Sequence, residues 1–256
     1  MVTGATNPSQ LLLRWDGSVV QWGGMHLGED SEQVWEFGSR EIRKQSMLSE
    51  VVRFLHTRFK NVDRVAFTKR YSETTVLPSV LVEGGSGAVD QWFNLHNSPQ
   101  EEIKTRAYHL DSVATDPVVI EAIDVAWEEA VLDSFPQSNN VVLAGAMLKG
   151  AVSLSRKAPG KWVVYVDAGE KGADIVAAKD GVPRYTGPTP SGLTDSMLYN
   201  IVNAMHRDGL MPVDVCVRIF GERCEDLVES MKRFFRDVEV LGGEDCKWFG
   251  LKAISE

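Results

Sequence analysis

The chain has 256 residues, of which 43% are hydrophobic and 25% charged, and its formal net charge is −9. That length and composition are typical of a globular protein with a well-buried core. The negative charge argues against a nucleic-acid binder, because affinity for phosphates comes from clustered Lys and Arg. No apolar run approaches the roughly 18 residues of a membrane helix, and the polar stretch after Met1 is unlike a signal peptide. We therefore expect a cytoplasmic protein that binds neither nucleic acid nor a membrane.

The chain has three cysteines, Cys216, Cys224 and Cys246. An odd number without a CxxC pair fits neither a disulfide scaffold nor a zinc site. The five histidines are scattered, with no HxxxH or HExxH spacing, so we expect no metal site. The cysteine usage predicts a reducing compartment, which agrees with a cytoplasmic location.

A β-hairpin is expected near the start of the chain. Leu11–Trp15 and Ser18–Trp22 flank Asp16-Gly17, and Asp-Gly between two strand-forming runs favours a two-residue turn. A third strand, an amphipathic helix and a fourth strand are expected to follow at Gln33–Phe37, within Glu41–Lys60 and at Val62–Phe67.

The middle of the chain alternates short strands with helices, which indicates α/β architecture. Thr74–Leu81 contains Pro78 and is expected to be an extended segment or an edge strand. A short helix, two strands, a helix, a strand and a helix are then expected, in this order, at Asp90–Leu95, Glu102–Leu110, Val118–Ile123, Val125–Ser134, Asn140–Ala144 and Ala146–Leu154.

A second meander is expected at Trp162–Val166, Ala173–Ala178 and Val182–Thr186. Thr189-Pro190 resembles an N-cap and first-turn pair, and it predicts a helix from Pro190 to about Arg207. A strand, a helix, a closing strand and an edge segment are expected to follow at Val213–Phe220, Glu222–Phe235, Val238–Leu241 and Gly242–Glu256.

Landmarks in the two meanders recur at nearly one offset. Asp16 and Asp167, at the two hairpins, are 151 positions apart (167 − 16), and the strand openings Val62 and Val213 are also 151 apart (213 − 62). A histidine late in the preceding helix recurs at an offset of 150 (206 − 56), in His56 and His206. Because these landmarks share an element order, they indicate duplication of one unit.

The repeat predicts a duplicated α/β fold of two lobes, each with a β-meander followed by a helix and a strand. We expect the first lobe within residues 9–115 and the second within residues 159–256. Residues 116–158 either complete the first lobe or lie outside it.

Five stretches carry a resemblance through their order along the chain: Thr75–Ser79, Phe93–His96, Trp162–Asp167, Tyr185–Pro190 and Phe234–Val240. The lobe that contains the later stretches resembles the second lobe of the cell-division protein FtsA and the pilus protein PilM. From Leu11 to Leu241 the chain resembles a bacterial family of uncharacterised proteins with an actin-like ATPase fold, also called ribonuclease H-like. The resemblance implies this fold and no established activity.

The resemblance also implies where a nucleotide would bind. Active members of the superfamily close two lobes over ATP and Mg²⁺, with an Asp-x-Gly-(Thr/Ser/Gly) turn in each lobe. The second lobe keeps Asp167-Ala168-Gly169 but has Glu170 where the pattern has Thr or Ser. The first lobe has only Asp16-Gly17, a turn too short to wrap a phosphate, and a single glycine, Gly221, stands where the adenosine-binding stretch has two or three.

Asp167, Gly169 and Gly221 are therefore the cofactor-binding candidates if a nucleotide binds, with Asp167 for the metal, Gly169 for phosphate and Gly221 near adenine. The alternative is that Asp167 and Gly169 simply form the hairpin turn. No catalytic residue is identified.

Other patterns favour structural roles. Gly84–Gly87 is not followed by the Lys and Ser or Thr of a P-loop, and no GxSxG elbow is present. Cys224, near the start of a helix, favours a packing role. The seven tryptophans belong either to the core or to an exposed patch for a protein partner, and the sequence leaves both open.

These patterns favour a non-catalytic intracellular interaction or scaffold module with a degraded nucleotide site. The expected partner is another protein or a second copy of the chain. The alternative is an ATP-binding ATPase or phosphotransferase that uses ATP and magnesium.

Overall fold

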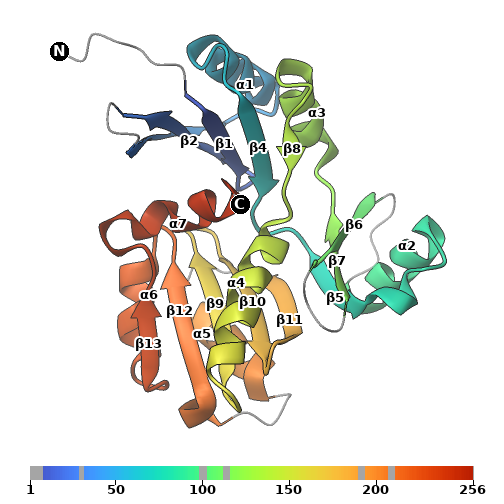
Figure 1. Cartoon of the computed structure of the whole chain (residues 1–256), viewed down its shortest axis with the longest axis vertical. Coiled ribbons are helices and arrows are strands. Elements are labelled where there is room, and N and C mark those ends of the chain that lie inside the picture. Colours follow the sequence, from blue (N-terminus) through green and yellow to red (C-terminus); the bar gives the residue numbers. More distant parts are fainter. Residues whose placement is uncertain are drawn as a thin grey trace. The chain divides into compact units, whose positions relative to one another are not determined.

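The computed structural model describes residues 8–28, 32–97, 103–111, 116–189, 194–206 and 211–255. The chain forms two compact units (Figure 1). Unit 1 consists of Met1–Arg70, Asp124–Val141 and Leu251–Glu256, and unit 2 consists of Tyr71–Ile123 and Val142–Gly250. The continuous lobes expected from the repeat, 9–115 and 159–256, remain a prediction.

Unit 1 contains a five-stranded sheet in the order β3-β2-β1-β4-β8. The first three strands are antiparallel neighbours, and β4 and β8 extend the sheet in parallel. The strands are β1 (Gln10–Trp15), β2 (Val19–Leu27), β3 (Gln33–Glu41), β4 (Arg64–Lys69) and β8 (Asn139–Asn140).

Two helices, α1 (Ser46–Arg58) and α3 (Val125–Ser134), bury their apolar stripes with one face of this sheet. Trp127 of α3 is at the centre of that core. Its ring lies 6.2 Å from Trp15 and 6.1 Å from Phe67, between ring centroids, and its Nε1–H donates to the carbonyl oxygen of Thr68 at 3.0 Å. The polar end of the tryptophan is therefore satisfied inside the core, as a buried indole requires.

Unit 2 contains a second five-stranded sheet, in the order β11-β10-β9-β12-β13. Its strands are β9 (Trp162–Ala168), β10 (Ala173–Lys179), β11 (Val182–Thr189), β12 (Val215–Phe220) and β13 (Asp237–Val240). Helices α5 (Thr194–His206) and α6 (Cys224–Met231) share a core with one face of the sheet, and α4 (Leu143–Lys157) packs on β9, β10 and β11.

Unit 2 also contains a three-stranded antiparallel sheet in the order β5-β7-β6. Its elements are β5 (Thr74–Pro78), η1 (Ser79–Leu81), α2 (Ser86–His96), β6 (Thr105–His109) and β7 (Pro117–Ala122). β5 is an edge strand, as Pro78 predicted, because proline cannot donate to a neighbouring strand.

The strand orders confirm the duplication. In each large sheet a three-stranded meander is followed by a helix, and the next strand pairs in parallel with the first strand of the meander. β1 pairs with β4 as β9 pairs with β12. The two hairpin aspartates therefore lie at the ends of equivalent strands, Asp16 just after β1 and Asp167 one residue before the end of β9. The landmarks at offsets of 150 and 151 therefore mark one unit used twice.

The strands expected to open at Val62 and Val213 each begin two residues later, at Arg64 and Val215, and Val213 lies in η2 (Pro212–Asp214). Three further elements differ from the expectations. Thr189 ends strand β11 instead of capping a helix, and the following helix begins at Thr194, while Pro190 and Arg207 are outside the described residues. Val141–Ala144 does not form a strand: Val141 still donates to the carbonyl oxygen of Phe67, but α4 begins at Leu143 because its alanines and leucines favour a helix.

The third difference is the segment after β13, which was expected to be an edge segment. It folds instead as η3 (Gly243–Asp245), α7 (Cys246–Lys252) and η4 (Ala253–Ser255). Burial explains the change, since Cys246, Leu251 and Ile254 are all buried, whereas an edge segment would leave part of them exposed.

The core of unit 1 can be tested with two neighbouring residues of α1. Leu55 is fully buried, whereas Phe54 is 45% exposed. Leu55→Ala is expected to lower the free energy of unfolding by about 2–5 kcal/mol, because it leaves a cavity in the core. Phe54→Ala is expected to lower it by less than about 1 kcal/mol. Denaturant unfolding measures both values, and similar losses for the two variants would contradict this packing.

Candidate functional site at the ends of strands β9 and β12

The hairpin between β9 and β10 contains two of the predicted site residues. Asp167 is the penultimate residue of β9, and Gly169 opens the turn. The N–H of Gly169 donates to the carbonyl oxygen of Gly172 at 2.8 Å, which closes a turn whose two exposed residues are Glu170 and Lys171. The N–H group that was expected to cradle a phosphate is therefore used to close the hairpin.

Gly221 lies directly against this hairpin. A Cβ on Gly221 would overlap the carbonyl oxygen of Ala168 and lie 2.5 Å from Oδ1 of Asp167. Its φ of +101° is also in the region that favours glycine. The structure thus brings Asp167, Gly169 and Gly221 together, as the prediction required, but through close packing that leaves the Asp167 side chain with no exposed surface.

The loop after β12 is held by two further backbone bonds. The N–H of Arg223 donates to Ala168 at 3.1 Å, and the N–H of Gly221 donates to the carbonyl oxygen of Cys246 at 2.9 Å. The ring centroids of Phe220 and Phe249 are 5.0 Å apart. Residues at the start of α7 therefore pack against the loop where the resemblance placed adenine.

A disulfide between Cys224 and Cys246 fastens the same region. This corrects the expectation that the cysteines form no disulfide. The pairing could not be read from spacing, because the two residues are 22 positions apart and meet only through the fold. The packing role expected for Cys224 is confirmed, since Cys224 is buried in the core of unit 2.

The guanidinium of Arg223, next to Gly221, is held by nearby side chains. Its Nη2 donates to Oγ1 of Thr194 at 3.0 Å, and its Nε lies 3.3 Å from Oδ2 of Asp226. The only arginine in this loop is therefore positioned across the start of α5 and the first turn of α6.

The corresponding hairpin in unit 1 is also closed on itself. Oδ1 of Asp16 accepts the N–H of Ser18 at 2.7 Å and the N–H of Val19 at 2.6 Å, and the N–H of Asp16 donates to the carbonyl oxygen of Val19 at 3.2 Å. The tight turn expected from Asp16-Gly17 is confirmed. Its carboxylate caps the turn, and the same N–H groups are not available to a phosphate.

A buried thiol, Cys216, and a carboxyl, Asp237, lie at the starts of β12 and β13, away from the end of β12 that precedes Gly221. Burial raises the pKa of Cys216 to about 11, and its hydrogen bond to Asp237 adds to the shift. Burial alone would raise the pKa of Asp237, but hydrogen bonds from Cys216 and Arg218 and the charge of Arg218 bring it below its usual value. With a pKa of about 11, this thiol is protonated near pH 8 and is unsuited to act as a nucleophile.

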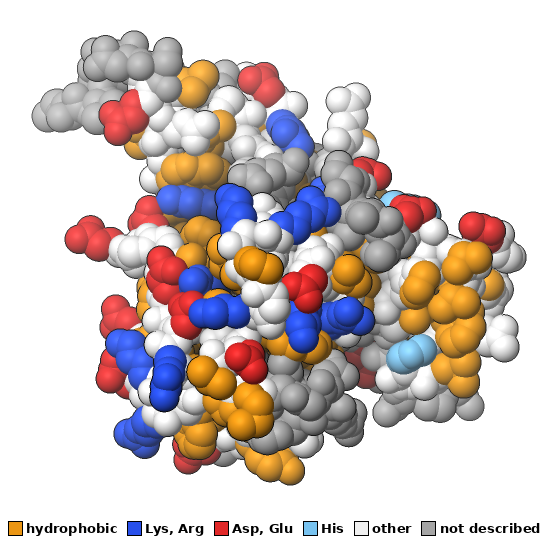
Figure 2. Space-filling model, turned by 60° about the horizontal axis from the view of Figure 1, so that its bottom comes forward, with side chains coloured by type: hydrophobic (Ala, Val, Ile, Leu, Met, Phe, Trp, Pro, Cys, Tyr) orange, Lys and Arg blue, Asp and Glu red, His pale blue; other side chains and the backbone are white. Residues whose placement is uncertain are grey.

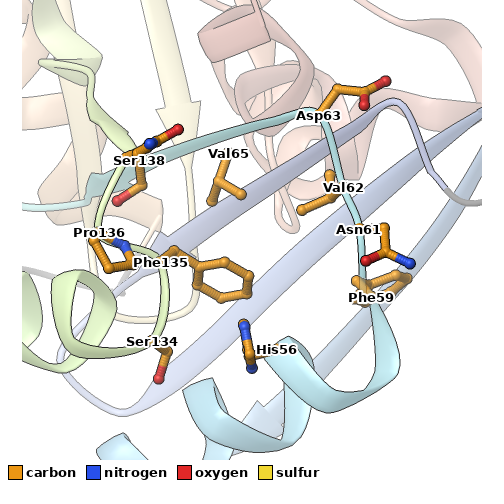
Figure 3. A pocket seen from close by; sticks show the side chains of 11 residues that line it. His56, Phe59, Asn61, Val62, Asp63, Val65, Ser134, Phe135, Pro136 and Ser138 are labelled. Atoms are coloured by element: carbon orange, nitrogen blue, oxygen red, sulfur yellow. The ribbon is translucent and has the colours of Figure 1, made fainter.

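Within the part of the chain that the structure describes, no group of three or more His, Cys, Asp or Glu side chains could hold a metal ion. A cavity of about 230 Å³ in unit 1 does contain a histidine (Figure 3). His56, in the last turn of α1 as expected, packs edge-on against Phe135 with ring centroids 5.2 Å apart. Asp63 lies at the far end of the cavity from His56, so the histidine is a packing partner there.

The surface carries both signs of charge. Figure 2 shows Lys and Arg side chains interspersed with Asp and Glu over the face in view, and a group of hydrophobic side chains beside a histidine on the side where α2 lies. Val80 of η1 and Leu95 of α2 are 65% and 67% exposed, and His96 is exposed. None of the described helices is long and apolar enough to cross a membrane.

Gly221→Ala tests the close packing at the hairpin. We expect a loss of roughly 3 kcal/mol or more in the free energy of unfolding, because both the positive φ and the overlap with Ala168 penalise a Cβ. Gly160→Ala in the same unit is the control: its φ is +76°, but nothing lies within 4 Å of a Cβ there, so only about 1 kcal/mol should be lost. Equal losses in denaturant unfolding would refute the contact.

The disulfide predicts a thiol count. Unfolded without reductant, the chain should expose one reactive thiol, Cys216, and three after reduction. The folded chain at about pH 8 should react slowly, because Cys216 is buried and its pKa is about 11. Titration with a chromogenic disulfide reagent measures these numbers, and Cys216→Ser is the control. Three thiols without reductant would show that Cys224 and Cys246 are not paired.

No protein-family model matches the chain, and no curated protein matches it. Solved structures do. A Bacteroides thetaiotaomicron protein with an actin-like ATPase fold and unknown function has a TM-score of 0.77 and 13% identity, covering 99% of this chain and 98% of that chain. A chain of the PilM–PilN type IV pilus biogenesis complex has a TM-score of 0.63 and 12% identity, covering 98% of each chain.

The ethanolamine utilization protein EutJ from Carboxydothermus hydrogenoformans has a TM-score of 0.51 and 12% identity, covering 100% of this chain and 92% of that chain. At these identities the likeness concerns the fold alone. It agrees with the two duplicated sheets and with the resemblance seen in the sequence. The chain therefore has the actin-like ATPase fold.

Proposed function

We propose that this chain is a non-catalytic interaction or scaffold module whose nucleotide site is degraded. The observation that carries the proposal is the use of the turn amides. The N–H groups of Gly169, Ser18 and Val19, which a phosphate would need, bond within their own hairpins. In addition, the N–H of Gly221 bonds to Cys246. These residues do not fit a phosphate cradle, and we derive no reaction step through ATP or magnesium.

A protein partner is favoured over a nucleic acid. The net charge of −9 would repel phosphates, and the exposed hydrophobic side chains Val80 and Leu95 are suited to a protein surface. One structure of the same fold is a PilM–PilN complex, in which PilM is assembled with another protein. The partner of this chain is accordingly another protein or a second copy of the chain. It would bind to surfaces of the two lobes, 9–115 and 159–256.

The location that we propose is the cytoplasm. A disulfide between Cys224 and Cys246 is unusual there, because cytosolic thiols are kept reduced. The disulfide would then form only under oxidising conditions. Its reduction would leave the packing of both residues in place, since both are buried.

The alternative function is an ATP-binding ATPase or phosphotransferase. The observation in its favour is that Gly221, which is far in sequence from Asp167 and Gly169, meets their hairpin at the ends of two neighbouring strands. In that case Asp167 would hold the metal and Gly169 would face the phosphates. The hairpin and the start of α7 would both have to rearrange first.

Thermal unfolding with nucleotide separates the two functions. A ligand at about 100 times its Kd stabilises a protein by about 2.7 kcal/mol, which raises the midpoint by a few degrees. We expect no shift with about 1 mM ATP, ADP or GTP and Mg²⁺, because the turn amides are already bonded. A shift that is present in the native chain and absent in Asp167→Asn would favour the nucleotide-dependent function over the proposed one.

A further inference from the structure

A groove in unit 2 lies between the edges of its two sheets. Strand β11 is an edge of the five-stranded sheet, strand β5 is an edge of the three-stranded sheet, and the two strands are neighbours in space. A cavity of about 650 Å³ is lined from one side by Arg184–Pro188 of β11 and from the other by Tyr71 and Glu73–Val76. This volume is in the range of ligand-binding sites.

The outer edge of β11 directs backbone groups into this groove. Hydrogen-bonded and non-hydrogen-bonded pairs alternate along an antiparallel ladder. Gly169 and Gly172 form a hydrogen-bonded pair, so every second residue of β10 from Gly172 bonds to β9. Ile175 is one of the residues between these, and it bonds to its partner in β11, Gly187. Thr186, one residue away, therefore points its N–H and C=O away from β10 and toward the groove.

Two prolines support this alternation. Pro188 is two residues from Thr186, so its backbone also faces away from β10. Pro183 pairs with Ala178, whose backbone bonds to β9 instead of β11. Proline has no N–H, so it is tolerated where an edge strand faces outward. The two prolines leave Thr186 as a position between them where the outer edge still offers an N–H.

The edge of β5 offers the same kind of groups from the other side. The N–H of Ala122 bonds to the carbonyl oxygen of Glu73, which sets the alternation between β5 and β7. Thr74 and Val76 therefore point their N–H and C=O groups away from β7, and both residues line the cavity.

The two edges touch without pairing. Oγ1 of Thr74 and Oγ1 of Thr186 are 2.9 Å apart and share a hydrogen bond. Among the described residues, no backbone hydrogen bond joins β5 to β11. The groove thus combines the side-chain bond between Thr74 and Thr186 with the outward backbone groups of Thr74, Val76 and Thr186. An extended chain supplies partners for such groups at the spacing of a strand.

One arginine, Arg184, and one glutamate, Glu73, line the groove. Arg184 is exposed, lines the cavity, and forms no ion pair with any residue that the structure describes. Asn97 also lines the cavity, and its Nδ2 donates to Oγ1 of Thr75 at 2.8 Å. An acidic side chain beside Arg184 would be favoured, and it would also fix the register of a bound strand.

We propose that this groove binds an extended polypeptide segment of a partner protein, which pairs with the outer edge of β11 at Thr186 and carries an acidic residue beside Arg184. The inference rests on the proposed function only in assuming that the chain binds proteins. In strand addition the backbone hydrogen bonds supply the affinity, and pockets for alternate side chains supply the specificity.

The test uses peptides of about twelve residues, selected with the purified full chain from a random library displayed on phage. The enriched peptide, made by synthesis, is the probe. Its Kd should rise at least about tenfold in Thr186→Pro, which removes the outward N–H and leaves the bonds of β11 to β10 intact. Thr186→Val is the matched control: it loses the bond to Thr74 but keeps the N–H, so the Kd should change less than about twofold.

Two further measurements complete the test. Arg184→Glu should weaken an acidic peptide about three- to tenfold, with a smaller effect at high salt. Hydrogen exchange of the Thr186 amide in the native chain, followed by NMR, should slow at least about tenfold when the peptide is added. This measurement decides the question even if Thr186→Pro fails to fold.

Failure to enrich any peptide, or binding that is unaffected by Thr186→Pro and leaves Thr186 exchange unchanged, would overturn the proposal. Slowed Thr186 exchange on self-association without peptide would assign the groove to a second copy and also overturn it. So would a co-purifying small molecule that displaces the peptide in native mass spectrometry. The nucleotide experiment is independent: an ATP-induced shift would remove the proposed function and leave peptide binding at Thr186 unaffected.

Discussion

The contact between Gly221 and the end of β9 governs the arrangement of the candidate site. Because Gly221 has no Cβ, the loop after β12 can lie directly on Asp167 and the backbone of Ala168. That approach brings the N–H of Arg223 to Ala168 and turns the N–H of Gly221 toward Cys246. A residue with a side chain at position 221 would separate the loop from the hairpin, and α7 would lose the surface on which its first turn packs.

The same contact fills the space beside the Asp167 hairpin. A glycine beside the Asp hairpin is what the resemblance to nucleotide-binding proteins implied, and the structure has it. Here, however, the space is occupied by the chain's own backbone and by a buried carboxylate. A fold alone does not define an activity, because the partners of single backbone groups decide what a site can bind.

The fold could be predicted from the sequence because its main signals are local and repeated. Asp16-Gly17 between two strand-forming runs, and the offset of 151 to Asp167, were sufficient to predict two meanders. The helical segment after β13 was missed because it is short and because its buried residues Cys246 and Leu251 do not follow the i, i+3, i+4 repeat of an amphipathic helix.

The details of the candidate site were less predictable, because they depend on contacts between distant residues. The disulfide joins Cys224 to a residue of α7, and the bond from Gly221 to Cys246 depends on where that helix packs. Tight turns were expected from the glycines. Which group accepts each turn N–H, such as Gly172 for Gly169, depends on the folded shape of the hairpin. Asp167 could be recognised as important, whereas its complete burial follows only from the packing of Gly221.

The division of the chain has a consequence for biosynthesis. Leu251 and Ile254 are buried in unit 1, whose sheet and helices come from residues before position 142. During translation from the N-terminus, more than a hundred residues of unit 2 must be synthesised before these two side chains become available. The fold of unit 1 is therefore completed only after synthesis of the whole of unit 2, although most of its sheet is made first.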